Sequence, residues 1–324
     1  MDNTSKNLRN YALSVIDNIG KVIIGKRDVA ELATIAIMGE GHLLIEDLPG
    51  VGKTMLARSL AISLGASFKR VQFVPDLLPS DIVGINLYNQ KTSEFQFREG
   101  PIMANIVLAD EINRGTPKTQ SALLEAMEES QVTVDGVTHT LPNPFFLIAT
   151  QNPLEHEGTF QLPEAQRDRF FLRLHIGYPS YETELDIMDL NRKKHPIDQL
   201  ESVSTINELL DLQQMVKEIY VDDLVKEYTL KIVQSTREHP QIFIGSSPRG
   251  TLNLYRAGQA KALLEGRDYV LPDDINDLVE PVIGHRIILD ANARMQGVSA
   301  ADILRQITAD IAVPGAVPRG WLKG

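Results

Sequence analysis

The sequence predicts an α/β protein, with a parallel-sheet core and helices on both faces in residues 1–179 and a smaller all-α domain in residues 180–324. Two observations predict this fold. In the first part, short apolar runs alternate with helical patterns, an order typical of parallel strands joined by crossover helices. In the second part strand-like runs become rare and helical patterns dominate, so we place the boundary just after Pro179.

The predicted elements follow one another along the chain as short strands and longer helices. The strands are residues 42–46, 68–73, 105–109, 144–150 and 170–176. Helical patterns cover residues 54–64 and 119–128 in the core, and 185–190, 206–218, 224–235 and 251–264 in the second part.

Two intervals interrupt this alternation and predict β-hairpins. Residues 131–141 alternate in polarity around Asp135 and Gly136, a strong hairpin signal. Residues 82–97 carry a weaker signal, because the turn region 91–94 lacks a glycine. From the residues alone, ordinary surface hairpins are the preferred explanation of both.

Composition limits the possible functions. The contents of 43% hydrophobic and 23% charged residues are typical of a globular protein. A net charge of −11 makes nucleic acid an unfavourable partner. The absence of cysteine excludes disulfides and thiolate metal sites. The N-terminus lacks the pattern of a secretory signal, and no apolar run is long enough for an integral membrane segment, so we expect a cytoplasmic protein.

The most specific motif is the series Gly50, Val51, Gly52, Lys53 and Thr54, which lies between the first predicted strand and a helix. Glycines let backbone N–H groups approach phosphates, and the helix N-terminus adds a favourable dipole. The lysine can reach the β- and γ-phosphate oxygens, and the threonine hydroxyl can bind Mg²⁺. The sequence therefore predicts a phosphate-binding loop, although Asp47 replaces the expected first glycine.

Polar residues follow two other predicted strands. Asp110 and Glu111 come at the end of the apolar run IVLA, where Asp110 could hold Mg²⁺ and Glu111 could orient a water for attack on a γ-phosphate. Asn152 follows the run FFLIAT, and ligands bind at this edge of open parallel sheets. Asn152 could bind the attacking water, or it could simply form an Asn-Pro turn.

Three arginines are candidates for contact with a charged transition state. Arg167 and Arg169 lie in the segment LPEAQRDRF, and Arg249 lies in GSSPRGTL at the start of a predicted helix. Guanidinium groups suit the charge that develops on a phosphoryl group in transfer. Spacing alone does not distinguish Arg167 from Arg169, and each arginine, taken alone, is more often a surface cation or a salt-bridge partner.

The order of these motifs resembles that of the MoxR-type AAA+ ATPases. The resemblance runs from Ile23 to the C-terminal region through EDLPGVGKT, QFVPDLLPSDIVG, FREGPIMANIVLADEINR, PKTQSALLEAMEESQVTVDG, FFLIATQNP, LPEAQRDRF and SPRGTL. It implies that residues 50–54 are a Walker A loop that binds ATP, that Asp110 and Glu111 are Walker B, and that Asn152 is sensor 1. Asp47 in place of the first glycine is usual in that family.

The resemblance also implies roles for residues outside these motifs. Ile24 and Gly25 correspond to residues that pass over the adenine. Arg169 corresponds to the arginine finger offered to a neighbouring subunit, and Arg249 to sensor 2. Arg167 stands where the family has leucine, so either arginine of the pair could cross the interface.

The family's biology gives further expectations. The two hairpins resemble the helix-2 and pre-sensor-1 inserts of a clade that includes magnesium chelatase motor subunits. We expect a homo-oligomeric ring, a hexamer, that uses ATP and Mg²⁺ to remodel, mature or insert metal into a protein client, together with a von Willebrand factor A domain partner.

Two alternatives remain from the sequence. A nucleic-acid-associated ring motor would need basic hairpin tips, but the tips read KTSE and DG. An ATP-gated scaffold without turnover would not need Glu111 and Asn152. The sequence Glu155, His156 and Glu157 fits a solvated loop better than a metal site, and Trp321 is expected to pack or to lie in an interface.

Overall fold

The structure is a computed structural model that describes residues 3–154, 159–190, 192 and 194–314. Contacts between Cα atoms divide the chain into two compact units, one of Asn3–Gln214 and one that takes in Met215–Gly324, and each is described by itself. Glu155, His156, Glu157 and Trp321 lie outside the described residues.

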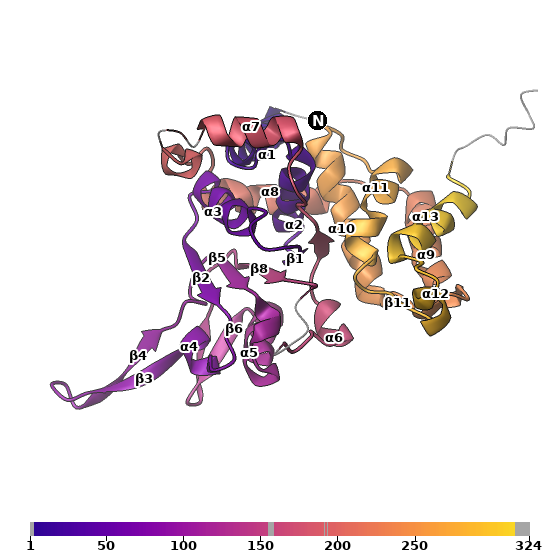
Figure 1. Cartoon of the computed structure of the whole chain (residues 1–324). Coiled ribbons are helices and arrows are strands. Elements are labelled where there is room, and N and C mark those ends of the chain that lie inside the picture. The colour runs from indigo at the N-terminus through magenta and orange to yellow at the C-terminus, as the bar shows by residue number, and fades with distance from the viewer. Residues whose placement is uncertain (1–2, 155–158, 191, 193, 315–324) are drawn as a thin grey trace, which may run out of the picture. The chain divides into compact units, whose positions relative to one another are not determined.

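The larger unit is built on a five-stranded sheet in the order β2-β5-β8-β1-β9, with every neighbouring pair parallel (Figure 1). The strands are β1 (Leu43–Glu46), β2 (Phe68–Gln72), β5 (Ile106–Asp110), β8 (Phe146–Gln151) and β9 (Leu172–Leu174). The interior strand β5 is buried along its whole length, as its continuous apolar sequence predicts. The predicted parallel-sheet fold is confirmed.

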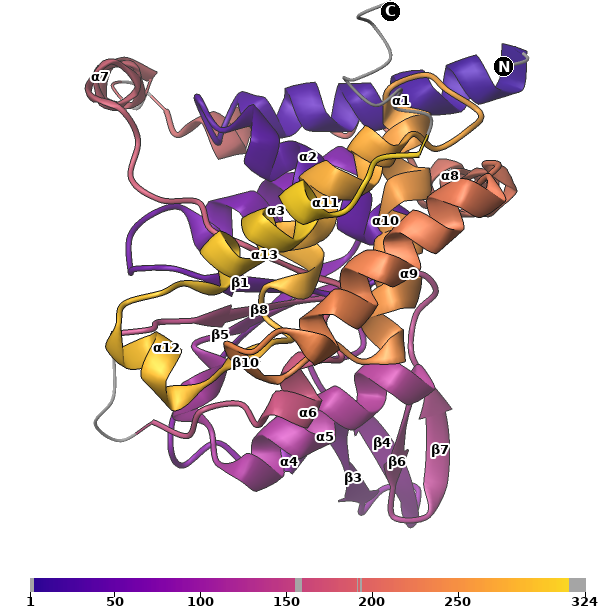
Figure 2. The same cartoon turned by 90° about the vertical axis from the view of Figure 1, so that its right-hand side faces the viewer.

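Helices cover both faces of this sheet. Figures 1 and 2 show α1 (Asn3–Gly20), α2 (Arg27–Met38) and α3 (Lys53–Ser63) on one side, and α5 (Pro117–Glu129) and α6 (Glu164–Arg167) on the other. Buried side chains of α5 and of the sheet form one apolar core, to which Phe73, Leu124, Leu147 and Phe170 contribute. The other elements of this unit are α4 (Pro79–Val83), η1 (Ile112–Arg114), α7 (Tyr181–Leu190), η2 (Pro196–Gln199) and most of α8 (Ile206–Glu218).

Strand β9 is shorter than the predicted run of residues 170–176. The reason is that the side chain of Asp47, in place of a strand carbonyl, accepts the hydrogen bonds at the end of β9. The backbone N–H groups of Ile176 and Gly177 donate to Asp47 Oδ2 at 2.6 and 2.7 Å. At the other end, the N–H of Phe171 bonds to the His42 carbonyl, 2.7 Å away.

Two hairpins extend from the sheet and contact one another. The first pairs β3 (Gly84–Asn89) with β4 (Glu94–Glu99), and the second pairs β6 (Gln131–Val134) with β7 (Val137–Thr140). The rings of Phe97 and His139 stack with centroids 3.8 Å apart, and Asn86 donates to Asp135 at 2.9 Å. Because both ring and amide contacts join them, the hairpins form one arm of the larger unit, shown at the lower left in Figure 1.

The smaller unit is mainly helical. It contains α9 (Asp223–Glu238), α10 (Pro248–Leu264), α11 (Pro272–Ile283), α12 (Ala291–Met295) and α13 (Ala300–Asp310), with a short antiparallel pair of β10 (Ile242–Ile244) and β11 (Ile288–Leu289). Buried leucine, isoleucine and valine side chains of α9, α10, α11 and α13 form its core.

The compact units meet within α8, later in the chain than the predicted boundary after Pro179. One reason is that the first turns of α8 belong with the sheet: Gln213 donates its amide to the carbonyl of Ile37 in α2, 2.8 Å away. Where the functional domains divide stays a prediction. No helix among the described residues is both long and apolar enough to cross a membrane.

Candidate functional site: a nucleotide loop and a carboxylate pair

The loop between β1 and α3 is shaped for contact with phosphates. Gly50 and Gly52 have φ angles of +84° and +101°, which favour glycine over residues with a Cβ atom. A Cβ atom at Gly50 would meet no heavy atom within 4 Å, so the backbone there borders open space. Helix α3 begins at Lys53, directly after Gly52, and its N-terminal N–H groups provide a favourable environment for an anion.

Asp47 holds this loop in place. Its buried carboxylate accepts the N–H of Leu48 at 2.8 Å on Oδ1, and the N–H groups that follow β9 on Oδ2. Its backbone carbonyl accepts a hydrogen bond of 2.6 Å from the Lys53 ammonium. A glycine at position 47 could not make the carboxylate contacts. The departure from the common loop motif therefore adds a tether to the neighbouring strand.

An apolar cavity of about 390 Å³ lies next to the loop. Its walls include Val22, Ile23, Ile24, Ile176 and Ile187, and Gly50 to Gly52 form part of its lining. Gly25 does not line the cavity; it has a φ of +71°, and a Cβ atom there would stand 2.8 Å from Thr183 Oγ1 of α7. An apolar cavity beside polar N–H groups suits a nucleotide, with the base in the cavity and the phosphates on the loop.

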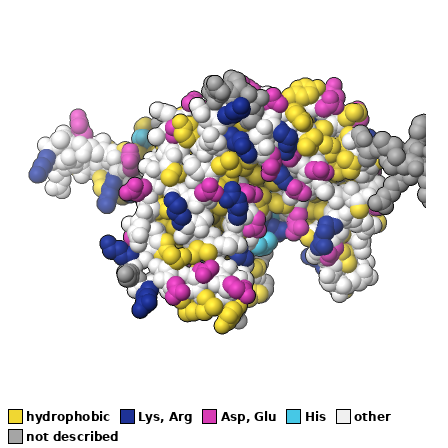
Figure 3. Space-filling view, turned by 90° about the horizontal axis from the view of Figure 1, so that it is seen from above, with side chains coloured by type: hydrophobic (Ala, Val, Ile, Leu, Met, Phe, Trp, Pro, Cys, Tyr) yellow, Lys and Arg dark blue, Asp and Glu magenta, His cyan; other side chains and the backbone are white. Residues whose placement is uncertain are grey.

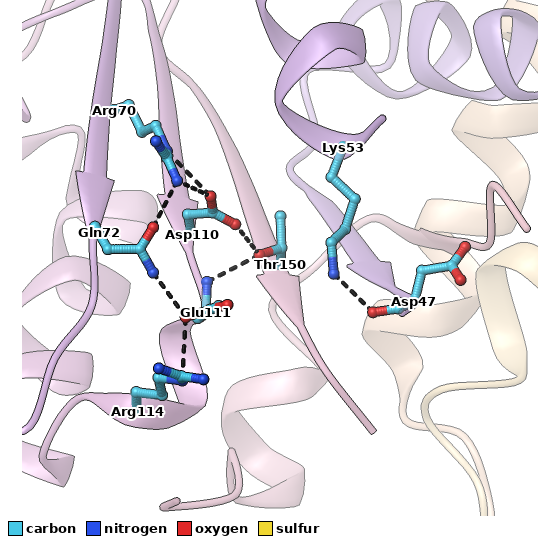
Figure 4. A network of polar contacts seen from close by, with 8 residues as sticks. All are labelled: Asp47, Lys53, Arg70, Gln72, Asp110, Glu111, Arg114 and Thr150. Carbon is cyan, nitrogen blue, oxygen red and sulfur yellow. Dashed lines mark hydrogen bonds and ion pairs between the residues drawn. The ribbon is translucent and has the colours of Figure 1, made fainter. Parts of the chain in front are cut away.

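The predicted carboxylate pair lies at the carboxyl end of β5 (Figure 4). Asp110 is 7% exposed, and Glu111 adopts a left-handed backbone with φ of +56° as the chain turns into η1. The hydroxyl of Thr150 on β8 connects the two residues. It donates to Asp110 Oδ1 at 2.6 Å and accepts the N–H of Glu111 at 2.9 Å.

Each carboxylate also has a cation of the same chain. Arg70 on β2 donates to Asp110 Oδ2 from Nε at 3.0 Å and from Nη2 at 2.7 Å. Arg114 forms an ion pair of 3.1 Å with Glu111 Oε2. Gln72 lies between them: its Oε1 accepts from Arg70 at 2.6 Å, and its Nε2 donates to Glu111 Oε2 at 2.7 Å.

Sequence reasoning missed Arg70, Gln72, Arg114 and Thr150. A signal was present for two of them, because Arg70 and Gln72 are two residues apart and so share one face of a strand. The pairing of β2 with β5, which places Gln72 opposite Asp110, is a long-range contact that the local sequence does not contain.

Comparisons with known proteins agree with this geometry. Residues 42–172 match the ATPase family associated with various cellular activities (AAA), and residues 234–307 match the AAA lid domain. The chain is 55% identical to the uncharacterised protein YeaC of Bacillus subtilis over 92% of this chain and 93% of that protein. It is 38% identical to the chaperone MoxR1 of Mycobacterium tuberculosis, over 94% of this chain and 83% of that one. The chain belongs to the MoxR-type AAA+ ATPases.

A solved structure extends the likeness to three dimensions. The crystal structure of a candidate ATPase from Cytophaga hutchinsonii matches with a TM-score of 0.89 and 38% identity, over 96% of this chain and 97% of that chain. Among the residues matched to the AAA family, the loop, the carboxylate pair, Asn152 and Arg169 all fall within one stretch. Arg249 falls within the lid match.

Asn152 stands just beyond β8 and is 6% exposed. Its Oδ1 accepts the N–H of Leu154 at 3.2 Å, which is the turn contact expected of an Asn-Pro sequence. Asn152 lies at the carboxyl edge of the sheet, where the sensor role would require it, and that role stays a prediction.

The two arginines near α6 have different surroundings. Arg169 donates to the carbonyl of Leu124 at 2.9 Å and forms an ion pair of 3.0 Å with Glu128, both on α5 of the same chain. The Nε atom of Arg167 is buried and has no hydrogen-bond partner in the part of the chain that the structure describes. Arg249 lies in the first turn of α10, in the other compact unit. The choice between Arg167 and Arg169 as the intersubunit arginine stays a prediction.

The residues present suit Mg²⁺. The described residues contain no group of three His, Cys, Asp or Glu side chains arranged to hold a metal ion. Mg²⁺ usually takes only one or two protein oxygen ligands and shares the rest with phosphates and water. The Thr54 hydroxyl in the first turn of α3 and the Asp110 carboxylate provide such oxygens.

Proposed function

We propose that this chain hydrolyses ATP to ADP and phosphate in a Mg²⁺-dependent reaction. The observation that carries this proposal is the position of Glu111, which follows directly after the buried interior strand β5, at the sheet edge where the loop also lies (Figure 4). Its backbone is fixed by Thr150. A carboxylate held in this way can orient a water molecule towards a γ-phosphate and accept its proton as the bond to the leaving ADP breaks.

The other residues of the site have distinct parts in this proposal. The N–H groups of the loop and the Lys53 ammonium bind the phosphates. Thr54 and Asp110 would hold Mg²⁺ and its waters, and bound Mg²⁺ neutralises the charge on the phosphate oxygens. Asn152 would hold the attacking water beside Glu111.

Turnover in this proposal requires a ring of identical chains, a hexamer. Arg169, or Arg167 in its place, would enter the nucleotide site of the neighbouring chain, and Arg249 would contact the γ-phosphate from the lid. Arginine fingers contribute about 10³–10⁵-fold to rate in better-measured phosphoryl-transfer systems. The side chain of Arg169 is 29% exposed even while paired with Glu128, which supports its availability to a neighbour.

The output of the cycle is proposed to be remodelling of a protein client, including its maturation or metal insertion, with a von Willebrand factor A domain partner. The name of the chaperone relative MoxR1 supports this direction. So does a path of contacts within the larger unit. Arg169 is bonded to α5, and α5 ends one residue before β6, whose hairpin stacks against the other hairpin. Movement of Arg169 would therefore reach the arm.

A nucleic-acid motor is less well supported. Figure 3 shows both cationic and anionic side chains on the face of the protruding arm that it draws. Lys91 and Arg98 alternate there with Glu94 and Glu99, and the chain as a whole carries a charge of −11. Filter binding of DNA should therefore give no retention above that of a control protein at physiological salt.

The test of ATP hydrolysis uses single-turnover phosphate release and ATP binding on the full chain. We expect Glu111→Gln to bind ATP and release no phosphate, and Lys53→Ala to lose ATP binding. Glu31→Gln, an exposed carboxylate on α2 that pairs with Arg27, is the matched control and should behave as the wild type. Normal turnover by Glu111→Gln would refute the catalytic assignment, and ATP binding by wild-type protein without phosphate release would favour the scaffold.

The client role has a separate test. Glu111→Gln should retain ATP and hold its client, so a tagged chain is used for capture in the presence of ATP. The Lys53→Ala variant, which should not bind ATP, serves as the control. A client or a von Willebrand factor A domain protein should be enriched only with Glu111→Gln, and equal recovery with both variants would contradict ATP-dependent remodelling.

A further inference from the structure

The buried carboxylate of Asp110 carries an arginine of its own chain at the place where a metal ion is expected. Arg70 directs two donors, Nε and Nη2, to the single oxygen Oδ2, at 3.0 and 2.7 Å. The other oxygen, Oδ1, accepts from Thr150. The Asp110 side chain is 9% exposed, whereas that of Arg70 is 46% exposed. Figure 4 shows Arg70 and Thr150 on opposite sides of this carboxylate.

Packing does not explain why arginine stands at this position. Strand β2 is at the edge of the sheet, and its only buried residue is Val71. The polar contacts of the Arg70 side chain go to Asp110 and Gln72. A buried carboxylate without a counter-ion is strongly unfavourable, and Asp110 has a second carboxylate, Glu111, as its direct neighbour. The position of Arg70 is therefore explained by its positive charge, which stabilises the buried carboxylate of Asp110.

We propose that Arg70 is a resident counter-ion that sets the affinity of the site for Mg²⁺. It orients and neutralises Asp110 when no metal is bound, and its positive charge opposes the entry of a second cation at the same carboxylate. The inference rests on the proposed function, because it takes Asp110 as the metal-binding residue. Charges this close interact strongly, since they lie well within the Debye length of about 8 Å in physiological salt.

This arrangement has a consequence for the order of binding. Mg²⁺ alone meets a carboxylate that is already neutralised by Arg70. Together with a nucleotide, Mg²⁺ also meets the negative phosphates, which offset the repulsion by Arg70. The site therefore takes the metal with the nucleotide and does not fill with Mg²⁺ alone.

The test compares charge with hydrogen bonding at position 70. Arg70→Gln removes the charge and keeps an N–H donor, whereas Arg70→Lys keeps the charge. ADP binding to the full chain is measured by calorimetry over a series of Mg²⁺ concentrations, so that hydrolysis plays no part. Melting curves with Mg²⁺ alone form a second readout. Arg27→Gln, which removes a guanidinium from exposed ion pairs with Asp17 and Glu31, is the matched control.

We expect Arg70→Gln to lower the Mg²⁺ concentration needed for half-maximal ADP binding on the order of tenfold, the size of effect that one hydrogen bond between charged groups can have. Mg²⁺ alone should raise the melting temperature of Arg70→Gln, but not that of wild type, Arg70→Lys or Arg27→Gln. Should Arg70→Gln not fold, Arg70→Met offers similar length without charge.

An unchanged or increased Mg²⁺ requirement in the uncharged variants would overturn the inference. Its failure is distinguishable from failure of the proposed function. If wild-type protein binds ADP with a clear Mg²⁺ dependence and the variants do not shift it, only the role of Arg70 is refuted. If wild-type protein binds no ADP at all, the nucleotide site itself is refuted.

Discussion

The hydroxyl of Thr150 should be decisive for turnover although it touches no phosphate in the proposed mechanism. It is completely buried and bridges Asp110 and Glu111, with hydrogen bonds of 2.6 and 2.9 Å. Replacement by valine keeps the shape and removes both bonds. A lost bond to an ionised carboxylate costs about 1.5–3 kcal/mol, and an unsatisfied buried N–H about 1–3 kcal/mol. We expect Thr150→Val to lower the free energy of unfolding by about 2–4 kcal/mol. This lies in the lower part of the range that the two costs give together, because solvent can compensate in part.

The effect on catalysis should exceed the effect on binding. With its N–H released, Glu111 loses the contact that fixes its left-handed backbone, so the carboxylate no longer points reliably at the attacking water. We expect kcat to fall about 10²-fold, as misplacement of a catalytic group by about 1 Å can do, while ADP affinity stays within about threefold because the loop is untouched. Thr150→Ser retains the hydroxyl and should keep most of the activity. Turnover of Thr150→Val within twofold of wild type, in a folded protein, would refute the positioning role.

Two further predictions concern pH and subunit contact. Burial lowers the pKa of His42 to about 4, and its Nδ1 accepts the N–H of Leu147 at 3.1 Å, so the folded protein holds a neutral ring. The unfolded chain takes up a proton below about pH 6.5, so stability is lost as pH falls from about 6.5 towards 4. The contribution of His42 to this loss should reach about 2 kcal/mol between pH 7.5 and pH 5. In urea unfolding, His42→Asn should lose less stability than the wild type over this range by that amount, and an equal loss in both proteins would contradict the prediction. Separately, Arg169→Ala should abolish phosphate release without weakening ATP binding. Glu128→Gln removes the ion pair of Arg169 with α5 but leaves its bond to the Leu124 carbonyl, and should raise turnover at low protein concentration. A loss of turnover as complete as that of Arg169→Ala would show that the ion pair assists catalysis.

Features that follow from local sequence were predictable. The strands β1, β5 and β8 were visible because each is a short apolar run, and a strand buried on both faces needs such a run. The edge strands β2 and β9 carry charged residues among their apolar ones. The loop was visible because its glycines and the following Lys53 are contiguous. Asp110 and Glu111 were visible because two carboxylates directly after an apolar strand are unusual. In all three cases the evidence lies within a few consecutive residues.

Features that depend on which strands are neighbours were not predictable. Arg70 and Thr150 lie 40 residues to either side of Asp110 in sequence, and they meet it only because β2 and β8 flank β5. A long-range contact also accounts for the division between compact units within α8, since Gln213 bonds to a carbonyl of α2. A polar residue on an exposed strand face gives no sign of its partner until the sheet order is known.

The role of Asp47 depends both on its place in the loop motif and on its long-range contacts in the fold. From sequence it is a departure from the glycine that phosphate loops usually have at this place, and it weakens the motif. In the fold, its carboxylate ends β9 by accepting the N–H groups of Ile176 and Gly177, and its carbonyl receives Lys53. Ile176 and Gly177 also line the cavity beside the loop. The residue that seemed to weaken the loop motif therefore fixes the loop, the lysine and one wall of the cavity relative to one another, which would preorganise the proposed nucleotide site.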